Sequence, residues 1–295
     1  MFIERFTRYL QFEKRYSPHT VIAYQKDLQQ FYAFIKLSEL DFENVTHTHV
    51  RSWMVELLDE GTAAKTINRK VSSLRSFYNF LLREQLITNE PMTRILSPKI
   101  PKRLPVVVEE QKINALLDDP DKNVFSIDFN GIRNRLIIEL LYGTGIRSAE
   151  LINLKETDIN VYDQQIKVLG KRNKERIIPV NASLLKLIVE YLAIKKSKKF
   201  NNNSLTLIVT NEGNDAYPKF IYRIVKSILS HISTHDKRSP HVLRHTFATS
   251  LLNNGAELNA IKELLGHASL AATQVYTHNS VERLKIIYKQ AHPKG

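Results

Sequence analysis

The sequence of 295 residues contains no cysteine, which excludes disulfide bonds and thiolate metal sites and gives no sign of secretion. It has no apolar run as long as the roughly 20 residues of a membrane-spanning helix. A concentrated polybasic tail, an internal repeat and a low-complexity tract are also lacking. The opening residues from Met1 to Phe6 are too charged and too periodic for a signal peptide, so we expect a cytoplasmic protein.

The chain instead has an excess of positive charge. It holds 43 Lys and Arg against 30 Asp and Glu, a formal net charge of +13, and 43% of its residues are hydrophobic. The length favours two domains, each large enough to bury a core. With no membrane segment in view, the charge favours a nucleic-acid partner over an anionic membrane surface.

Apolar residues recur at helical spacing through the first hundred positions and predict four amphipathic helices. They form four groups: Ile3, Phe6 and Leu10; Val21, Tyr24, Leu28, Phe31 and Ile35; Val50, Trp53 and Leu57; and Ile67, Val71, Leu74, Phe77 and Leu81. Ser17 before Pro18 and Thr46 are suited to N-caps, and Gly61 is suited to a helix end. A small helical bundle is expected over residues 1–96.

The outer face of the fourth predicted helix favours DNA contact. Lys65, Arg69, Ser72 and Ser76 share this face, with Asn68 and Arg75 beside it. Lysine and arginine reach phosphates, whereas short polar side chains let a helix approach base edges in the major groove. The alternative interpretation is an ordinary solvated face.

A basic, proline-rich segment follows at residues 97–106. Its prolines keep it extended and non-helical, as in a linker between domains. We expect Lys102 and Arg103 to follow the DNA backbone, so that the two domains form a clamp around the duplex. A hinge without DNA contacts is the alternative.

Residues 107–279 are expected to form a second domain that is mainly helical with a small antiparallel β element. Short alternating runs at 158–161, 165–169 and 176–179 predict three strands. A buried helix is expected at 136–142, and further helices near 182–198, 217–233, 241–253, 257–265, 269–277 and 280–291.

The last third of the chain, together with Arg147 upstream of it, carries residue types that suit an attack on phosphate. A phosphodiester resists cleavage because its negative charge repels nucleophiles and its alkoxide leaves poorly. Arg147, after the glycines of Tyr142-Gly143-Thr144-Gly145, and Arg244 could together hold both non-bridging oxygens. A tyrosine needs such cations nearby, because a phenol of pKa about 10 is about 0.1% ionised at pH 7.

Each of these residues also has a simpler interpretation. His241 and His245, four positions apart, could bind zinc, although Arg244 would then place a cation beside the metal. Arg147 could only pair with Glu150, three residues on. Tyr276 could be one of the chain's 12 tyrosines and pack its ring in the core.

The motifs taken together resemble the tyrosine recombinase family, of the phage integrase type, and most closely its bacterial Xer members. The resemblance is carried by Pro240-His241-Val242-Leu243-Arg244-His245, Leu264-Leu265-Gly266-His267 and Tyr276-Thr277-His278. The segment from Tyr142 to Leu151 is similar to the family's first-arginine motif, and Gly170-Lys171 with Lys174-Glu175-Arg176 to its lysine-bearing hairpin. Nearly the whole chain is covered, from the opening around Tyr16-Ser17-Pro18.

The resemblance implies a role for each position. Tyr276 would attack the scissile phosphate to form a 3′-phosphotyrosyl link, which a second strand's 5′-hydroxyl reverses without ATP. The other five residues would assist it: Arg147 and Arg244 on the non-bridging oxygens, His267 as a further donor, Lys171 as general acid and His241 in proton transfer at the tyrosine. No metal or other cofactor is expected.

The hairpin departs from the family pattern at one position. The family usually has glycine directly after the lysine, whereas this chain has Arg172, which adopts a left-handed backbone less easily. Asn173 could carry the bend instead. If the hairpin is shifted, Lys174 is the substitute general acid.

The resemblance also implies partners. The first domain would be a SAM-like core-binding domain. The short amphipathic tail at 280–295 could fold onto its own domain or dock on a neighbour, and the resemblance favours docking on a neighbouring protomer. The assembly would be a homo- or hetero-tetramer on two DNA sites, with a second Xer-type recombinase and possibly a DNA translocase. The expected function is site-specific recombination that resolves chromosome or plasmid dimers at cell division. An integrase or invertase of a mobile element with the same chemistry is the alternative, and a non-catalytic DNA-binding protein is disfavoured because all six catalytic positions are filled.

Overall fold

The computed structural model describes residues 2–100, 107–118, 124–170, 174–200, 204–233, 238–266 and 278–292, and in the last range side chains only from 284 onward. The chain divides into two units, Met1–Arg103 and Leu104–Gly295. The division falls within the segment predicted as a linker. Each unit has its own hydrophobic core.

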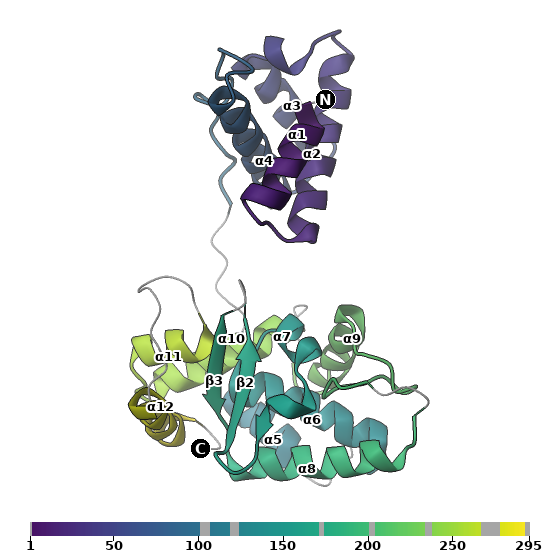
Figure 1. Cartoon of the computed structure of the whole chain (residues 1–295), viewed down its shortest axis with the longest axis vertical. Helices are drawn as coiled ribbons and strands as arrows, with labels where there is room; N and C mark the ends of the chain where they lie inside the picture. Colours follow the sequence, from purple (N-terminus) through teal and green to yellow (C-terminus); the bar gives the residue numbers. More distant parts are fainter. Residues whose placement is uncertain are drawn as a thin grey trace. The chain divides into compact units, whose positions relative to one another are not determined.

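The first unit is a helical bundle, shown in purple and blue in Figure 1. Its main helices are α1 (Phe2–Arg8), α2 (Pro18–Lys36), α3 (His47–Asp59) and α4 (Ala64–Arg83). A π-helix at Tyr9–Glu13 follows α1, and a 3₁₀ turn at Phe42–Asn44 precedes α3. The four predicted helices are confirmed.

Local signals define the ends of these helices. The Ser17 hydroxyl accepts a hydrogen bond from the Thr20 amide at 3.3 Å, with Pro18 in the first helical position. The Thr46 amide donates to Nδ1 of His49 at 3.1 Å at the start of α3. Gly61 follows the end of α3 with a left-handed φ of +78°. These residues are the ones that the sequence marked as helix boundaries.

The second unit places helices around a three-stranded antiparallel sheet. Its strands are β1 (Ile159–Asn160), β2 (Gln165–Leu169) and β3 (Glu175–Pro179), in the order β1-β2-β3. Val168 is paired with Arg176, and Ile166 with Ile178. The three predicted strands are confirmed within a residue or two.

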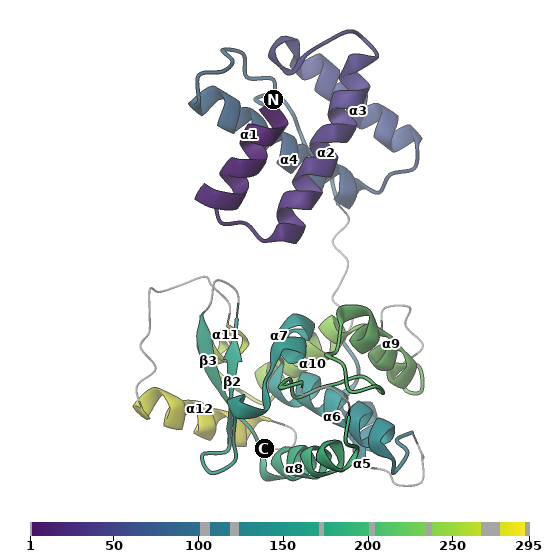
Figure 2. The same ribbon diagram turned by 45° about the vertical axis from the view of Figure 1, so that its right-hand side comes forward.

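The helices of this unit, in chain order, are α5 (Glu110–Asp118), α6 (Phe129–Thr144), α7 (Ser148–Asn153), a 3₁₀ turn at Glu156–Asp158, α8 (Ala182–Ser197), α9 (Pro218–Leu229), α10 (Pro240–Asn253), α11 (Leu258–Leu265) and α12 (His278–Ala291). Helix α6 is buried almost throughout and packs against both α8 and α10, as Figures 1 and 2 show. The helix predicted at 269–277 lies outside the described residues. Within those residues, no helix is long and apolar enough to cross a membrane.

Helix α12 packs on its own unit. Leu284 and Tyr288 are buried there, and the Tyr288 hydroxyl donates to the carbonyl of Gly143 at 2.8 Å. The side-chain amide of Asn254 donates to the carbonyl of Ala291. This arrangement in the single chain differs from the docking on a neighbouring protomer that we expected, because the apolar face of the helix covers its own core. Docking in trans stays a prediction.

Candidate active site

Arg147 stands at the junction of two helices. Helix α6 ends at Gly145 with a left-handed φ of +61°, and α7 begins at Ser148 with Arg147 as its N-cap. A Cβ on Gly145 would lie 2.4 Å from Cδ1 of Phe247, so this position requires glycine for space as well as for backbone conformation. The tight turn directs the Arg147 side chain, which stays 38% exposed, toward the site.

A buried carboxylate fixes Arg147. Glu150 accepts from the Arg147 amide at 2.8 Å through Oε2 and from Arg147 Nη1 at 2.7 Å through Oε1. The ion pair that was the simpler interpretation of Arg147 and Glu150 is therefore present. It uses one of the guanidinium nitrogens. Within the described residues, Nε and Nη2 of Arg147 make no hydrogen bond.

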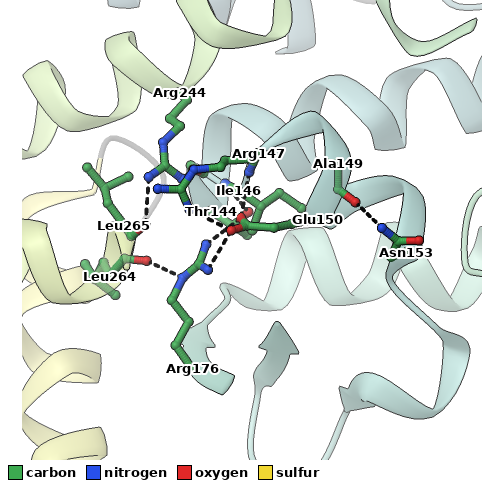
Figure 3. A network of polar contacts seen from close by, with 11 residues as sticks. Thr144, Ile146, Arg147, Ala149, Glu150, Asn153, Arg176, Arg244, Leu264 and Leu265 are labelled. Carbon is green, nitrogen blue, oxygen red and sulfur yellow. Dashed lines mark hydrogen bonds and ion pairs between the residues drawn. The ribbon is translucent and has the colours of Figure 1, made fainter. Parts of the chain in front are cut away.

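The same carboxylate is held from below by Arg176 of β3 (Figure 3). Arg176 Nη1 and Nη2 donate to the two oxygens of Glu150 at 3.0 and 2.8 Å, and its Nε donates to the carbonyl of Leu264 at 2.8 Å. The side chain is only 3% exposed. A guanidinium from the sheet thus joins the start of α7 to the end of α11.

Arg244 reaches the site from α10. It donates from Nη1 to the carbonyl of Gly145, and from Nη2 to the carbonyl of Leu265 at 2.7 Å. Figure 3 shows its guanidinium beside that of Arg147. The structure therefore brings together the two arginines that the sequence predicted as a phosphate clamp.

The electrostatics of this cluster favour an anion. Burial alone would raise the pKa of Glu150, but its bonds to Arg176 and Arg147 outweigh burial and hold that pKa below its usual value. Burial, together with the neighbouring charge of Arg147, lowers the pKa of Arg244 to about 10. Arg147 and Arg176 both bond the Glu150 carboxylate, and the guanidinium of Arg244 lies beside that of Arg147, so the cluster is rich in positive charge and suits a phosphate.

The predicted residues Lys171, His267 and Tyr276 lie outside the described residues, but two of them directly follow glycines next to this cluster. The Gly170 amide donates to the carbonyl of Lys174 at 2.8 Å, which joins the residue after β2 to the residue before β3. A Cβ on Gly170 would lie 3.7 Å from Oε1 of Glu150, and one on Gly266 would lie 3.1 Å from Cδ of Arg176. Gly170 and Gly266 thus both lie against the Glu150–Arg176 pair.

His241 lies in the first turn of α10, three residues before Arg244, and is exposed. His245 is partly buried on the same helix and lines a groove beside α11. Within the described residues, no three His, Cys, Asp or Glu side chains lie close enough together to hold a metal ion.

Sequence reasoning gave no role to Arg176 and treated Glu150 only as a competing partner of Arg147. The alternation of residues along the predicted strand could have indicated that Arg176 is buried. In β3 it occupies the same face as Ile178, two residues on, and that face is buried. A charged residue at an inward-facing strand position needs a buried partner, and the partner is Glu150.

In the first unit, α4 exposes Lys65, Arg69 and Ser72 as predicted. The Arg69 side chain is 46% exposed, and its Nη1 bonds the carboxylate of Asp27 on α2, which is 1% exposed. Lys70 and Ser73 bind the same carboxylate at 3.4 and 2.8 Å. The predicted DNA contacts Lys102 and Arg103 lie outside the described residues.

Two residues beside this face have internal roles. The side-chain amide of Asn68 donates to the carbonyl of Pro98 at 2.9 Å, and Arg75 donates to the carbonyl of Ile95 at 3.1 Å. They hold the segment that leads toward the second unit against α4. The exposed face is therefore narrower than the sequence suggested.

Known proteins are similar to this chain over nearly its full length. Residues 107–283 match the phage integrase family, and residues 3–85 match the phage integrase N-terminal SAM-like domain. The tyrosine recombinase XerC of Listeria innocua is 39% identical, over 99% of this chain and 97% of the relative. The tyrosine recombinase XerD of Staphylococcus haemolyticus is 36% identical, over 99% of both chains.

Solved structures share the fold. The recombinase XerH bound to a palindromic difH substrate in a post-cleavage complex is similar with a TM-score of 0.72 and 22% identity, over 97% of this chain and 93% of that one. A lambda integrase dimer bound to a COC′ core site gives a TM-score of 0.67 and 19% identity, over 93% and 98% of the two chains. The chain therefore belongs to the phage integrase family and is a tyrosine recombinase of site-specific DNA recombination.

Proposed function

We propose that the cluster around Arg147 and Arg244 holds the scissile phosphate of a DNA recombination site and that Tyr276 attacks that phosphate. The observation that carries this proposal is the meeting of the two guanidiniums beside Gly145, from segments almost a hundred residues apart. Arg147 offers Nε and Nη2, which make no bond among the described residues. Such planar forks can bind both non-bridging oxygens of a phosphodiester.

Tyr276 would form the 3′-phosphotyrosyl link, with Lys171 protonating the leaving 5′ oxygen and His267 donating to the phosphate. His241 would assist proton transfer at the phenol. The attack forms one P–O bond as the P–O5′ bond breaks, so the link conserves the energy needed for rejoining and requires no ATP. The positions of Gly170 and Gly266 against the Glu150–Arg176 pair support this assignment, because Lys171 and His267 are the next residues.

The test is to trap the covalent intermediate. DNA attached to the protein would be recovered from denatured cells and sequenced, and a duplex of that sequence would be made with a nick next to the scissile phosphate, so that the cleaved fragment diffuses away. We expect a denaturation-resistant adduct that forms in the presence of chelator and disappears in Tyr276→Phe. An adduct that persists in Tyr276→Phe would refute the assignment, and no adduct with any recovered site would refute the activity.

We further propose that the biological role is the resolution of chromosome or plasmid dimers, in the cytoplasm. Relatives named XerC and XerD match over 99% of the chain, which favours this role over integration of a mobile element. The recovered DNA distinguishes the two, because a single chromosomal or plasmid locus is expected for dimer resolution. The ends of a mobile element would instead identify an integrase or invertase.

The protein is proposed to act as a homo- or hetero-tetramer on two sites, with a second Xer-type recombinase and a DNA translocase as candidate partners. A groove of about 360 Å³ between α10 and α11 supports such an assembly, since it is lined mainly by apolar residues that include Leu252, Leu258 and Ile261. Leu252 and Leu258 are both about half exposed. The groove would receive the tail of a neighbouring protomer.

Groove variants test the assembly better than removal of the tail, because deletion would also take Leu284 and Tyr288 from the chain's own core. The pair Leu252→Glu with Leu258→Glu should leave binding of one protomer to DNA intact and prevent the joining of two sites, measured by sedimentation of the protein–DNA complex. Ile127→Glu, at another exposed apolar residue, is the control and should join sites normally. Normal joining by the groove pair would exclude this surface.

A further inference from the structure

Arg176 lies where the segments of the proposed active site converge. It bonds Glu150, which fixes Arg147, and it bonds the carbonyl of Leu264, near the end of α11. Its side chain also contacts the positions of Gly170 and Gly266, which precede Lys171 and His267. Arg176 is only 3% exposed, so it offers almost no surface to a substrate. Its influence on the reaction must pass through these neighbours.

The negative charge of Glu150 gives Arg176 a role beyond packing. A carboxylate that faced Arg147 alone would largely offset the positive charge intended for the phosphate. Both oxygens of Glu150 instead bond the fork of Arg176, at 3.0 and 2.8 Å, while also accepting from Arg147. The carboxylate is thus shared, and Arg147 is held in place without being neutralised.

We propose that Arg176 is a positioning residue of the recombinase reaction: it balances the charge of Glu150, so that Glu150 can orient Arg147 while the charge of Arg147 remains available to the scissile phosphate. This inference rests on the proposed function, in which Arg147 binds that phosphate. It assigns a role in charge balance to a residue that never touches the DNA.

The proposal predicts that removing Arg176 slows adduct formation to an extent that depends on the charge of the scissile linkage. A methylphosphonate at the scissile position replaces one charged non-bridging oxygen by a methyl group, so the linkage needs less positive charge from the protein. A role confined to packing would slow the cleavage of both linkages equally. The informative quantity is the ratio of the adduct-forming rate on the phosphodiester to that on the methylphosphonate.

The experiment measures these two rates in single turnover, with saturating protein on the nicked site described above and the two methylphosphonate stereoisomers assayed separately. For Arg176→Gln we expect the phosphodiester rate to fall about 100-fold and the methylphosphonate rate to fall less than about tenfold, the scale of losing one preorganised charge-stabilising group. Adding Glu150→Gln should raise the ratio again at least about tenfold, because the unbalanced carboxylate is then gone.

Arg133→Gln is the matched control. Arg133 is also a buried arginine of this unit, at 2% exposed, but it bonds Asn211 and Asn134, away from the cluster. We expect it to lower the melting temperature without changing the ratio. Site binding and melting temperature of every variant would be recorded alongside the rates.

If Arg176→Gln does not fold, Arg176→Lys decides the matter, because it keeps the buried charge but an ammonium cannot bond both carboxylate oxygens as the fork does. The ratio should then fall by about threefold or more. An unchanged ratio in the folded Arg176 variants overturns the inference. Failure of the wild-type protein to form any adduct would instead overturn the proposed function.

Discussion

The two units of this protein hold an exposed arginine in the same way. In the first unit Asp27, 1% exposed, binds Arg69, whose side chain is 46% exposed. In the second unit Glu150, 7% exposed, binds Arg147, whose side chain is 38% exposed. Each buried carboxylate has further cationic or hydroxyl partners behind the exposed guanidinium. The buried carboxylate thereby orders the exposed side chain in advance, which would lower the entropy cost of the proposed contact with DNA.

The two clusters differ in how their partners are assembled. Asp27 is held by residues of one neighbouring helix, α4, at positions 69, 70 and 73. Glu150 and Arg147 meet Arg176 from β3 and Arg244 from α10, and these in turn bond carbonyls at the ends of α6 and α11. The first cluster is a contact between two helices, whereas the second joins α6, α7, β3, α10 and α11. We expect the second cluster to control chemistry and the first to control binding.

Replacing the exposed arginines should separate these roles, with the largest effect expected at Arg147. Arg147→Gln should slow covalent adduct formation about 1,000-fold or more, the scale of an arginine that stabilises a transferring phosphoryl group. Site binding should change little. Both are measured on the nicked site, by adduct formation and by gel shift.

Arg69→Gln is the matched substitution in the first unit. It should weaken site binding and leave the rate at saturating DNA nearly unchanged, because Arg69 lies in the unit that is not expected to carry the chemistry. A large loss of rate at saturating DNA would contradict the separation of roles.

Removing the charge of either carboxylate should destabilise its own unit by about 3–5 kcal/mol, since buried cations lose their partner. The chain has one tryptophan, Trp53, which lies in the first unit, so its fluorescence during urea unfolding follows that unit. Asp27→Asn should shift the fluorescence transition to a lower urea concentration. Glu150→Gln should leave that transition in place and shift the remaining transition in circular dichroism; a shift of the fluorescence transition by Glu150→Gln would show that the units are coupled.

The pH dependence of unfolding stability tests whether Glu150 is ionised in the folded protein. Because the folded protein holds the pKa of Glu150 below its ordinary value of 4.5, its stabilising charge is present above that pH and is lost as pH falls through the folded pKa. The stability difference between wild type and Glu150→Gln should be constant from pH 7 to about 5 and shrink below pH 4.5. A constant difference down to the acid transition would contradict the ionised pair.

A smaller difference between the two units is expected when a glycine with a left-handed backbone is replaced by alanine. Gly145→Ala should cost about 3 kcal/mol, because it combines backbone strain with a clash against Phe247. Gly61→Ala, at a φ of +78° but with no atom within 4 Å of its added Cβ, should cost about 1 kcal/mol. The urea transitions described above measure both, and equal costs would mean that the packing around Gly145 adjusts.

The smallest effect is expected at Lys65, which is exposed on α4. If it neutralises one phosphate, Lys65→Ala should reduce the slope of log K against log salt by about 0.9. Binding titrations at several salt concentrations measure the slope. Lys226→Ala, on α9 of the second unit, provides a comparison with another exposed lysine. An unchanged slope in Lys65→Ala would show that this part of α4 is an ordinary solvated face.

The sequence alone predicted the helices of the first unit, the three strands and the two arginines of the site. These features depend on short-range patterns: the period of apolar residues, caps such as Ser17, and motifs around Gly145 and Arg244. It also predicted Arg69 and Lys65 on one face, because positions four apart on a helix are neighbours whatever the rest of the chain does.

Only the tertiary structure decided what each arginine binds. Arg69 turned out to hold Asp27, 42 residues away, and Arg176 to hold Glu150 and Leu264, 26 and 88 residues away. Helix α12 likewise covers its own core through Leu284 and Tyr288. A linear pattern records which residues share a face of one element, but the partner of a buried charge is set by the packing of elements distant in sequence, where desolvation makes pairing obligatory.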